Sequence, residues 1–166
     1  MTLPSLRLKA NADRRLRAGH LWVFSNEIDT AVTPLTAFQP GDQALLESAG
    51  GKPLGIVGVS PNNLICARLL SRDQRHPLDK SLLVHRIKVA LSLRERLFET
   101  PHYRLVYGDS DFLPGLVVDR FGDILVVQLA SATMDKHRED VVAALVQVLK
   151  PSGILFKNDS SARDAE

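Results

Sequence analysis

The chain has 166 residues, of which 45% are hydrophobic and 24% charged, and its net charge is +2 at pH 7. This length suffices for one domain or two small ones, and the composition is that of an ordinary soluble globular protein. No apolar run approaches the roughly 20 residues of a membrane-spanning helix, and the polar, basic first residues lack the apolar core of a signal peptide. The single cysteine, Cys66, excludes an internal disulfide. The composition therefore predicts a reducing, cytoplasmic setting.

Charge is distributed unevenly along the chain. Residues 1–25 carry five Lys or Arg against one acidic residue, and residues 66–100 carry eight against four. Residues 26–65 and 101–166 each have three more acidic than basic residues. The two basic segments could converge on one face and bind phosphates. The alternative is that they form two separate solvated faces.

The N-terminal part begins with short elements. Leu6–Lys9 alternate apolar and basic residues, which predicts a half-exposed strand. Arg14–Ala18 are predicted to form a short helix that ends at Gly19. An aromatic-bearing strand over His20–Ile28 follows, and Trp22 within it is expected in the core.

Three more strands are predicted after the turn at residues 40–42. They cover Gln43–Glu47, Leu54–Val59 and Leu64–Leu70. The second contains two glycines, which indicate a bulge or a close backbone approach. Several short strands joined by tight turns suggest a small barrel. Cys66 lies in the last strand and is interpreted as an inert core thiol.

Residues 71–77 are polar, have no apolar period and end in proline, so the domain junction is predicted here. The predicted domains are residues 1–72, a linker at 73–77 and a second domain at 78–159. That second domain should open with a long amphipathic helix over Leu78–Phe98, capped by Asp79. The buried stripe of this helix is expected to include Leu97 and Phe98.

A β-hairpin is predicted at the centre of the second domain. A short strand over Leu105–Tyr107 leads into a polar turn, and Leu116–Val118 and Ile124–Leu129 then form the two arms. A helix over Met134–Leu149, capped by Thr133, and a last strand over Ile154–Phe156 follow. The fold class predicted for the whole chain is α+β.

One long motif spans this hairpin: Gly108-Asp109-x-Asp111-x-Leu113-Pro114-Gly115-Leu116-x-Val118-Asp119-Arg120-x-Gly122-Asp123. It resembles the middle domain of the ribosomal RNA large-subunit methyltransferase I family. Gly19-His20-x-Trp22-Val23-Phe24 is similar to the start of the PUA domain in the same family. The resemblance implies a PUA-like small β-barrel, followed by a small α/β domain with a central β-hairpin and flanking helices.

The resemblance also implies a parent enzyme that uses S-adenosylmethionine to methylate a ribosomal cytosine at carbon 5. The cofactor cradle and the nucleophilic cysteine of that family belong to a further Rossmann-like domain. No G-x-G-x-x-G occurs in this sequence, and Cys66 matches no catalytic motif. We therefore expect no catalytic, cofactor-binding or metal-binding residues here, and no methylation by this chain alone. Because Ser161-x-x-Asp164 has the form of a helix start, residues 160–166 are expected to begin a truncated methyltransferase domain.

The leading hypothesis is that the chain recognises large-subunit ribosomal RNA and positions the substrate. Its expected RNA contacts come from the two basic segments, and the alternative for each is solvated surface. These residues are Lys9, Arg14, Arg15, Arg17, His20, Arg68, Arg72 and Arg75.

Two other hypotheses belong to different classes. The chain could be a protein-interaction scaffold that forms a homodimer, with the hairpin pairing across a two-fold axis. It could also be a small metal-dependent enzyme that uses Asp109, Asp111 and Asp119. Turn formation by aspartate is the better account of these carboxylates, because the EF-hand pattern is absent.

Overall fold

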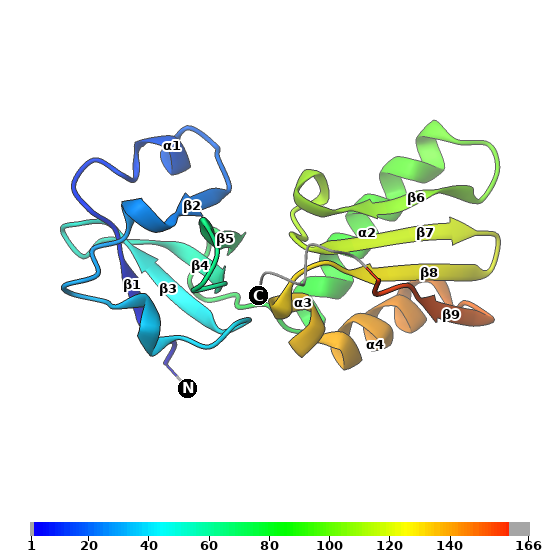
Figure 1. Ribbon diagram of the computed structural model, residues 1–166. Helices are drawn as coiled ribbons and strands as arrows, with labels where there is room; N and C mark the ends of the chain where they lie inside the picture. Colours follow the sequence, from blue (N-terminus) through cyan, green and yellow to red (C-terminus); the bar gives the residue numbers. More distant parts are fainter. Residues whose placement is uncertain (1, 160–166) are drawn as a thin grey trace. The chain divides into compact units, whose positions relative to one another are not determined.

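The computed structural model describes residues 2–159, which divide between Pro77 and Leu78 into an N-terminal unit and a C-terminal unit (Figure 1). The expected start of a methyltransferase domain at residues 160–166 lies outside the described residues. No helix among residues 2–159 is both long enough and apolar enough to cross a membrane.

The N-terminal unit is a curled five-stranded sheet with the strand order β1-β3-β4-β5-β2 (Figure 1). β1 pairs with β3 in parallel, and the other pairs are antiparallel. The strands are β1 (Ser5–Arg7), β2 (Trp22–Phe24), β3 (Gln43–Glu47), β4 (Pro53–Val59) and β5 (Ile65–Ser71). Between β1 and β2 lies the short helix α1 (Arg14–Arg17), and two 3-10 turns follow β2, η1 (Ser25–Glu27) and η2 (Leu35–Ala37).

The two edges of this sheet nearly meet. Leu8, just after β1, forms an isolated antiparallel bridge with Ile28. The Lys9 amide donates to the Glu27 carbonyl, and the Asp29 amide donates to the Arg7 carbonyl, each over 2.9 Å. Closure of this kind leaves few unpaired backbone groups at the sheet edges. The predicted PUA-like β-rich domain is confirmed as a curled half-barrel.

Alternation along the strands fills the inside of the half-barrel with apolar side chains. In β3, for example, Ala44 and Leu46 are buried while their neighbours are half-exposed. Cys66 is fully buried in the same core, with its Sγ 3.6 Å from the Val23 carbonyl oxygen. Burial raises the pKa of the Cys66 thiol to about 11. These features confirm that Cys66 is a core residue.

The expectation that Trp22 lies in the core was wrong. β2 has only three residues, and Val23 takes the inward position, so Trp22 points outward and is 43% exposed. The predicted strand also ends earlier, at Phe24. The Glu27 carboxylate accepts a hydrogen bond from the Phe24 amide over 2.9 Å, which stabilises the 3-10 turn that follows.

The predicted close backbone approach in β4 occurs at Gly55. This residue has φ of +146°, and a Cβ atom there would lie 2.3 Å from the Ser71 carbonyl oxygen. Only glycine fits without displacing the backbone at the end of β5.

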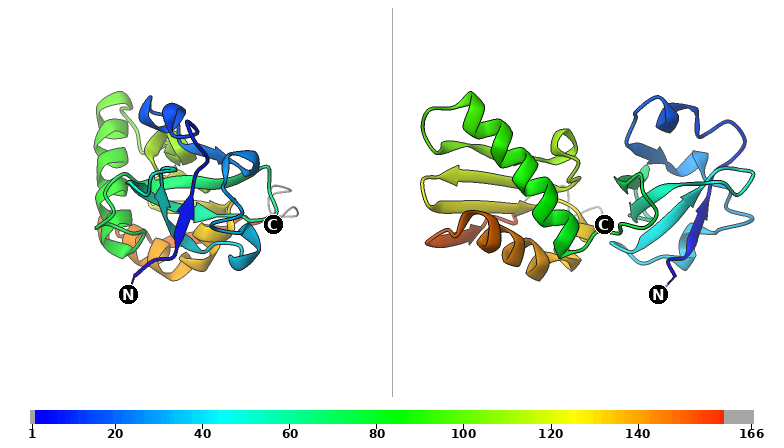
Figure 2. Two further views of the ribbon diagram at one scale, coloured as in Figure 1. Left: turned by 90° about the vertical axis from the view of Figure 1, so that its left-hand side faces the viewer. Right: turned by 180° about the vertical axis from the view of Figure 1, so that it is seen from behind.

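The C-terminal unit is a four-stranded sheet with the order β6-β7-β8-β9 (Figure 1). Its strands are β6 (His102–Tyr107), β7 (Leu116–Phe121), β8 (Ile124–Leu129) and β9 (Gly153–Phe156), and the 3-10 turn η3 (Gly108–Asp111) follows β6. Its helices are α2 (Lys80–Leu97), α3 (Ala132–Lys136) and α4 (Arg138–Leu149). α2 and α4 pack side by side on one face of the sheet (Figure 2). The predicted second domain, a small sheet with flanking helices, is confirmed.

The predicted hairpin is present as β7 and β8, with paired residues from Leu116↔Leu129 to Phe121↔Ile124. Both of its outer edges are already paired, β7 with β6 and β8 with β9. The hairpin therefore cannot extend the sheet across a two-fold axis, as the scaffold hypothesis supposed.

The predicted cap of α2 is confirmed, because the Asp79 carboxylate accepts from the Leu82 amide over 2.8 Å. The predicted buried stripe extends too far, since Leu97 and Phe98 are exposed. About one turn earlier, α2 carries Arg94. The Arg94 guanidinium binds Asp111 in the polar turn after β6 and does not contribute to an apolar stripe.

The predicted single helix over Met134–Leu149 is two helices, α3 and α4, separated at His137. Thr133 is not the cap. It is buried inside α3, and Ser131 caps the helix by accepting from the Met134 amide over 3.2 Å. Gly115 makes room for this cap, because a Cβ there would lie 2.1 Å from the Ser131 hydroxyl.

Two of the four aspartates of the motif bind arginines. Arg94 and Asp111 form a bidentate pair with two N–O distances of 2.8 Å, and Asp111 also accepts from the Tyr107 amide over 2.7 Å. Asp119 pairs with Arg104 over 2.8 Å. No group of three or more His, Cys, Asp or Glu residues within residues 2–159 is placed to hold a metal ion. Two of the three carboxylates named in the metal-enzyme hypothesis, Asp111 and Asp119, are thus held by arginines.

Asp111→Ala should lower the free energy of unfolding by about 3 kcal/mol, because it leaves the largely buried Arg94 guanidinium without its counter-ion. Chemical denaturation measures this. Glu95→Ala, an exposed carboxylate on the same helix, is the control and should change stability by less than about 0.5 kcal/mol. A similarly small effect for Asp111→Ala would show that the pair is not structural.

The free energy of unfolding should fall as pH rises from about 9 to about 11 because of Cys66. The folded chain holds the thiol proton more tightly than the unfolded chain, so stability present below pH 9 is lost as pH passes the folded pKa of about 11. The slope from one such group is at most about 1.4 kcal/mol per pH unit. Urea denaturation across this range should show a shallower slope for Cys66→Ala than for the unmodified chain. Equal slopes would contradict the burial of a neutral thiol.

Candidate nucleic-acid interface

All eight residues expected to contact RNA lie in the N-terminal unit. Three arginines form α1 itself, Lys9 and His20 flank it, Arg68 lies on β5, and Arg72 and Arg75 follow β5. Arg68 is half-buried, and the other seven residues are exposed. Their hydrogen bonds and ion pairs decide which of them lie together.

Arg72 joins the two basic segments of the sequence. Its Nη1 donates to the Leu16 carbonyl over 3.0 Å and its Nη2 to the His20 carbonyl over 3.5 Å. α1 has only four residues, and the carbonyls of Arg14, Arg15 and Leu16 accept from the backbone amides of residues 18–20 that follow it. The guanidinium adds a second donor to the Leu16 carbonyl, which also accepts from the Gly19 amide, and one to the His20 carbonyl; it thus ties residues 16–20 to the end of β5.

Arg68 lies beside the exposed Trp22. The register of β5 and β2 places these two residues directly opposite each other, and such pairs share one face of a sheet. An exposed indole next to a guanidinium can stack on an unpaired base while the cation meets a phosphate. Sequence reasoning missed Trp22 because the alternation in a three-residue strand does not reveal which face is inward.

Acidic neighbours hold three of the arginines. Arg15 binds Glu27 over 3.1 Å, with its guanidinium 4.9 Å from the Phe24 ring centre. Arg17 binds Asp13 over 2.5 Å. Since exposed ion pairs are weak, a phosphate can compete with these carboxylates.

Arg75 is the third arginine that is held by an acidic neighbour. Its guanidinium makes a bidentate contact with Asp73, with a shortest distance of 2.7 Å. The guanidinium holds the pKa of the Asp73 carboxyl well below its usual range. The ion pair directs Arg75 back along its own loop.

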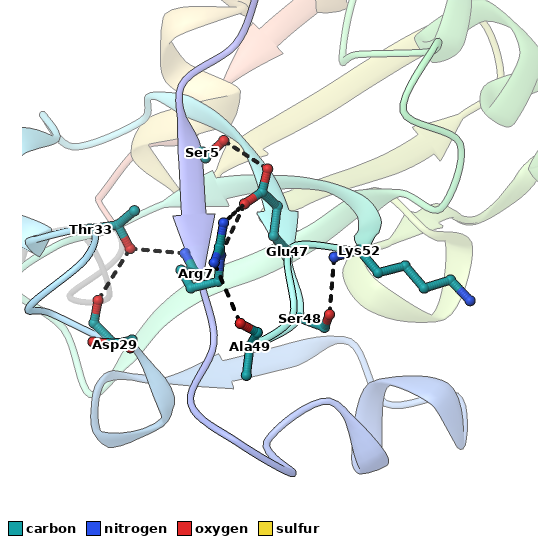
Figure 3. A network of polar contacts seen from close by, with 8 residues as sticks. All are labelled: Ser5, Arg7, Asp29, Thr33, Glu47, Ser48, Ala49 and Lys52. Atoms are coloured by element: carbon teal, nitrogen blue, oxygen red, sulfur yellow. Dashed lines mark hydrogen bonds and ion pairs between the residues drawn. The ribbon is translucent and has the colours of Figure 1, made fainter.

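Lys52 also reaches this part of the unit, although it stands alone as the one basic residue of the acidic segment 26–65. The charge distribution along the sequence therefore did not indicate Lys52 as an RNA contact. Its backbone amide donates to the Ser48 hydroxyl over 3.1 Å, within the turn between β3 and β4. Its side chain extends away from that turn (Figure 3).

A polar network braces the turn that carries Lys52 (Figure 3). Arg7 on β1 binds Glu47 on β3 through Nε at 3.0 Å and Nη2 at 2.8 Å. Its Nη1 donates to the Ala49 carbonyl over 3.4 Å. Arg7 is thereby used in the fold, while Lys52 is presented to solvent.

Comparison with protein families supports this description of the N-terminal unit. A family model for a PUA-like domain matches residues 6–72. Curated relatives named ribosomal RNA large subunit methyltransferase I match nearly the whole chain. The relative from Pseudoalteromonas translucida is 32% identical over 164 residues, which are 96% of this chain and 40% of the relative. The relative from Erwinia tasmaniensis is 35% identical over 165 residues, which are 97% of this chain and 41% of the relative. The resemblance drawn from the sequence is confirmed, and the chain spans about two-fifths of the length of these relatives.

Two solved structures described as putative methyltransferases share the fold. One, a SAM-dependent protein from Streptococcus mutans by its description, superposes with a TM-score of 0.79 at 20% identity, covering 94% of this chain and 41% of the other. The second, complexed with SAH, has a TM-score of 0.75 at 18% identity and covers 95% of this chain and 40% of the other.

Arg72→Ala should lower the free energy of unfolding by about 1–2 kcal/mol, because the two hydrogen bonds that tie residues 16–20 to the end of β5 are lost. Amide hydrogen exchange should also become faster at residues 17–20. Arg75→Ala is the matched control, since its side chain binds only its neighbour Asp73 among the described residues, and it should leave both measurements unchanged. Unaltered exchange in Arg72→Ala would mean that α1 does not depend on this guanidinium.

Proposed function

We propose that this chain, a homologue of the proteins named ribosomal RNA large subunit methyltransferase I, is the part of such an enzyme that recognises RNA and positions the substrate. The observation that carries the proposal is the contact of Arg72 with α1, which joins two basic segments in a PUA-like domain. The partner proposed is ribosomal RNA of the large subunit.

Phosphate contacts and shape are the physical basis of the proposed recognition. The major groove of A-form RNA is too narrow for side chains to reach the bases, so paired RNA is bound through its backbone. The exposed arginines of α1, with Arg72 beside them, supply cations for this. Trp22, beside Arg68, supplies a surface on which an unpaired base can stack.

The methyl transfer is proposed for the parent enzyme and not for this chain alone. S-adenosylmethionine would bind in the parent, because the sequence here has no glycine-rich cradle of the G-x-G-x-x-G type. Attack on a base needs an accessible thiolate. Cys66 is fully buried in the half-barrel, and its raised pKa keeps it protonated near neutral pH. Cys66 therefore does not fit the role of the nucleophile.

A homodimer is a second proposal, and it would use a different surface from the hairpin. β9 is an edge strand with exposed apolar side chains, since Leu155 is 62% exposed and Phe156 38%. Edge strands of this kind can pair with a second chain. A dimer in light scattering that is abolished by Leu155→Lys would support it.

Replacing Arg14, Arg15 and Arg17 together with alanine should weaken binding to folded ribosomal RNA fragments. Fluorescence anisotropy over a salt series measures this, and the log–log salt slope should flatten by roughly 0.7 to 0.9 for each phosphate that is no longer neutralised. The fold should persist, because these side chains are exposed.

The matched control removes three exposed cations from α2 by replacing Lys80, Lys88 and Arg96 with alanine. It should bind as the unmodified chain does. Equal affinity of the α1 variant and the unmodified chain would remove α1 from the interface. Equal affinity of the unmodified chain for RNA and for duplex DNA would contradict the proposed function.

A further inference from the structure

A hollow of about 180 Å³ lies beside α1 in the N-terminal unit, between that helix and the start of β4. We call it the α1 hollow. Its inner wall is apolar and comes from three elements, with Leu16 from α1, Leu46 from β3 and Leu69 from β5. Each of these side chains is almost fully buried, so the wall is a continuation of the core of the half-barrel. Pockets for drug-sized ligands are larger, at about 300–1,000 Å³, so the α1 hollow can take only a small group, and ligand pockets are usually lined mainly by apolar groups.

The rim of the α1 hollow is basic. Arg17, Lys52 and Arg72 line it, and none of its lining residues within the described part of the chain is acidic. Asp13 neutralises part of the charge of Arg17. The Lys52 ammonium makes no hydrogen bond or ion pair with residues 2–159. Arg72 uses two of its five N–H groups on backbone carbonyls, so others remain for a ligand.

A second hollow of about 430 Å³ lies next to the first. It shares Pro53 and Arg72 with the α1 hollow and extends along the loop to Asp73 and Arg75, which bind each other over 2.7 Å. The missing Cβ of Gly55 allows the β5 end to approach β4 and places Arg72 between the two hollows. The two hollows therefore meet at Arg72, with the apolar recess and Lys52 in the first and the Asp73–Arg75 ion pair in the second.

An apolar recess with a cationic rim suits a ligand that has a flat, weakly polar part attached to a negatively charged backbone. A nucleotide in a duplex cannot present its base in this way, because the base is stacked and paired, whereas an unpaired nucleotide can. We expect no selectivity for a particular base, because an apolar wall can contact the face of any base.

We infer that the α1 hollow binds one unpaired nucleotide of the RNA, with the base in the apolar recess and its phosphate on Lys52 and Arg72. The next phosphate follows the second hollow and replaces the Asp73 carboxylate on Arg75. This inference rests on the proposed function and adds the kind of RNA feature that the site selects, namely an unpaired nucleotide next to a helix.

The test compares two RNA hairpins of equal length, one fully paired and one with a single unpaired nucleotide in its stem. The 166-residue chain should bind the second roughly tenfold more tightly, which is the effect expected for one accommodated base. Fluorescence anisotropy at fixed salt gives both affinities. A fluorescent adenine analogue at the unpaired position should change its emission on binding.

Lys52→Glu should reduce the preference for the hairpin with the unpaired nucleotide from about tenfold to less than about twofold. Its affinity for the fully paired hairpin should fall much less than its affinity for the hairpin with the unpaired nucleotide. Leu54→Asp, on the partly buried wall of the α1 hollow, should also reduce the preference for the unpaired nucleotide. Because this change can disturb folding, the result counts only if the circular dichroism spectrum matches that of the unmodified chain. Lys88→Glu places the same charge change on the exposed face of α2 and should keep the tenfold preference.

Each outcome separates this inference from the proposed function. Equal binding of both hairpins by the unmodified chain would overturn the inference and leave the proposed function in place. No binding of either hairpin at low salt would overturn both. If Lys52→Glu keeps the preference for the hairpin with the unpaired nucleotide, that nucleotide binds elsewhere. If both hairpins bind equally and an acidic peptide displaces the hairpin that carries the fluorescent adenine, the α1 hollow is a protein-binding site instead.

Discussion

The guanidinium of Arg72 is the contact on which the candidate surface depends. α1 has four residues, too few for a stable isolated helix, so its position is set by the burial of Leu16 and by the two carbonyls that Arg72 binds. Arg72 is itself positioned by a backbone approach that only Gly55 allows. One glycine and one arginine therefore place three exposed arginines of α1 beside the end of β5.

The same surface is restrained by its own acidic residues. Asp13, Glu27 and Asp73 each bind one arginine, so the charge offered to a polyanion is smaller than the arginine count suggests. Exposed pairs of this kind hold side chains in place without much stability, and phosphates can replace the carboxylates. Such a surface favours binding that is reversible and sensitive to salt. Lys52 has no carboxylate partner in the described chain, so its full charge lies next to an apolar recess.

In the C-terminal unit, the motif that carries the family resemblance serves the fold. Asp111 binds Arg94 and the Tyr107 amide, which connects the turn after β6 to α2. Gly115 leaves room for the hydroxyl that caps α3, and Gly122 forms the hairpin turn at a positive φ of 65°. A motif rich in aspartate can suggest chemistry, but here Asp111 and Asp119 are matched to arginines within the unit.

Local patterns in the sequence determined the kind and approximate position of most elements, because alternation, helical spacing, caps and glycine turns act over a few residues. They sufficed for the β7–β8 hairpin, the Asp79 cap of α2 and the two basic segments. The tertiary structure alone decided that Trp22 faces outward, that Arg94 meets Asp111 and that Lys52 joins Arg72 around one hollow. These outcomes depend on strand register and on partners far apart in the chain, such as Leu16 and Arg72, which are 56 residues apart. No local pattern contains such a contact, because only the folded backbone brings its two ends together.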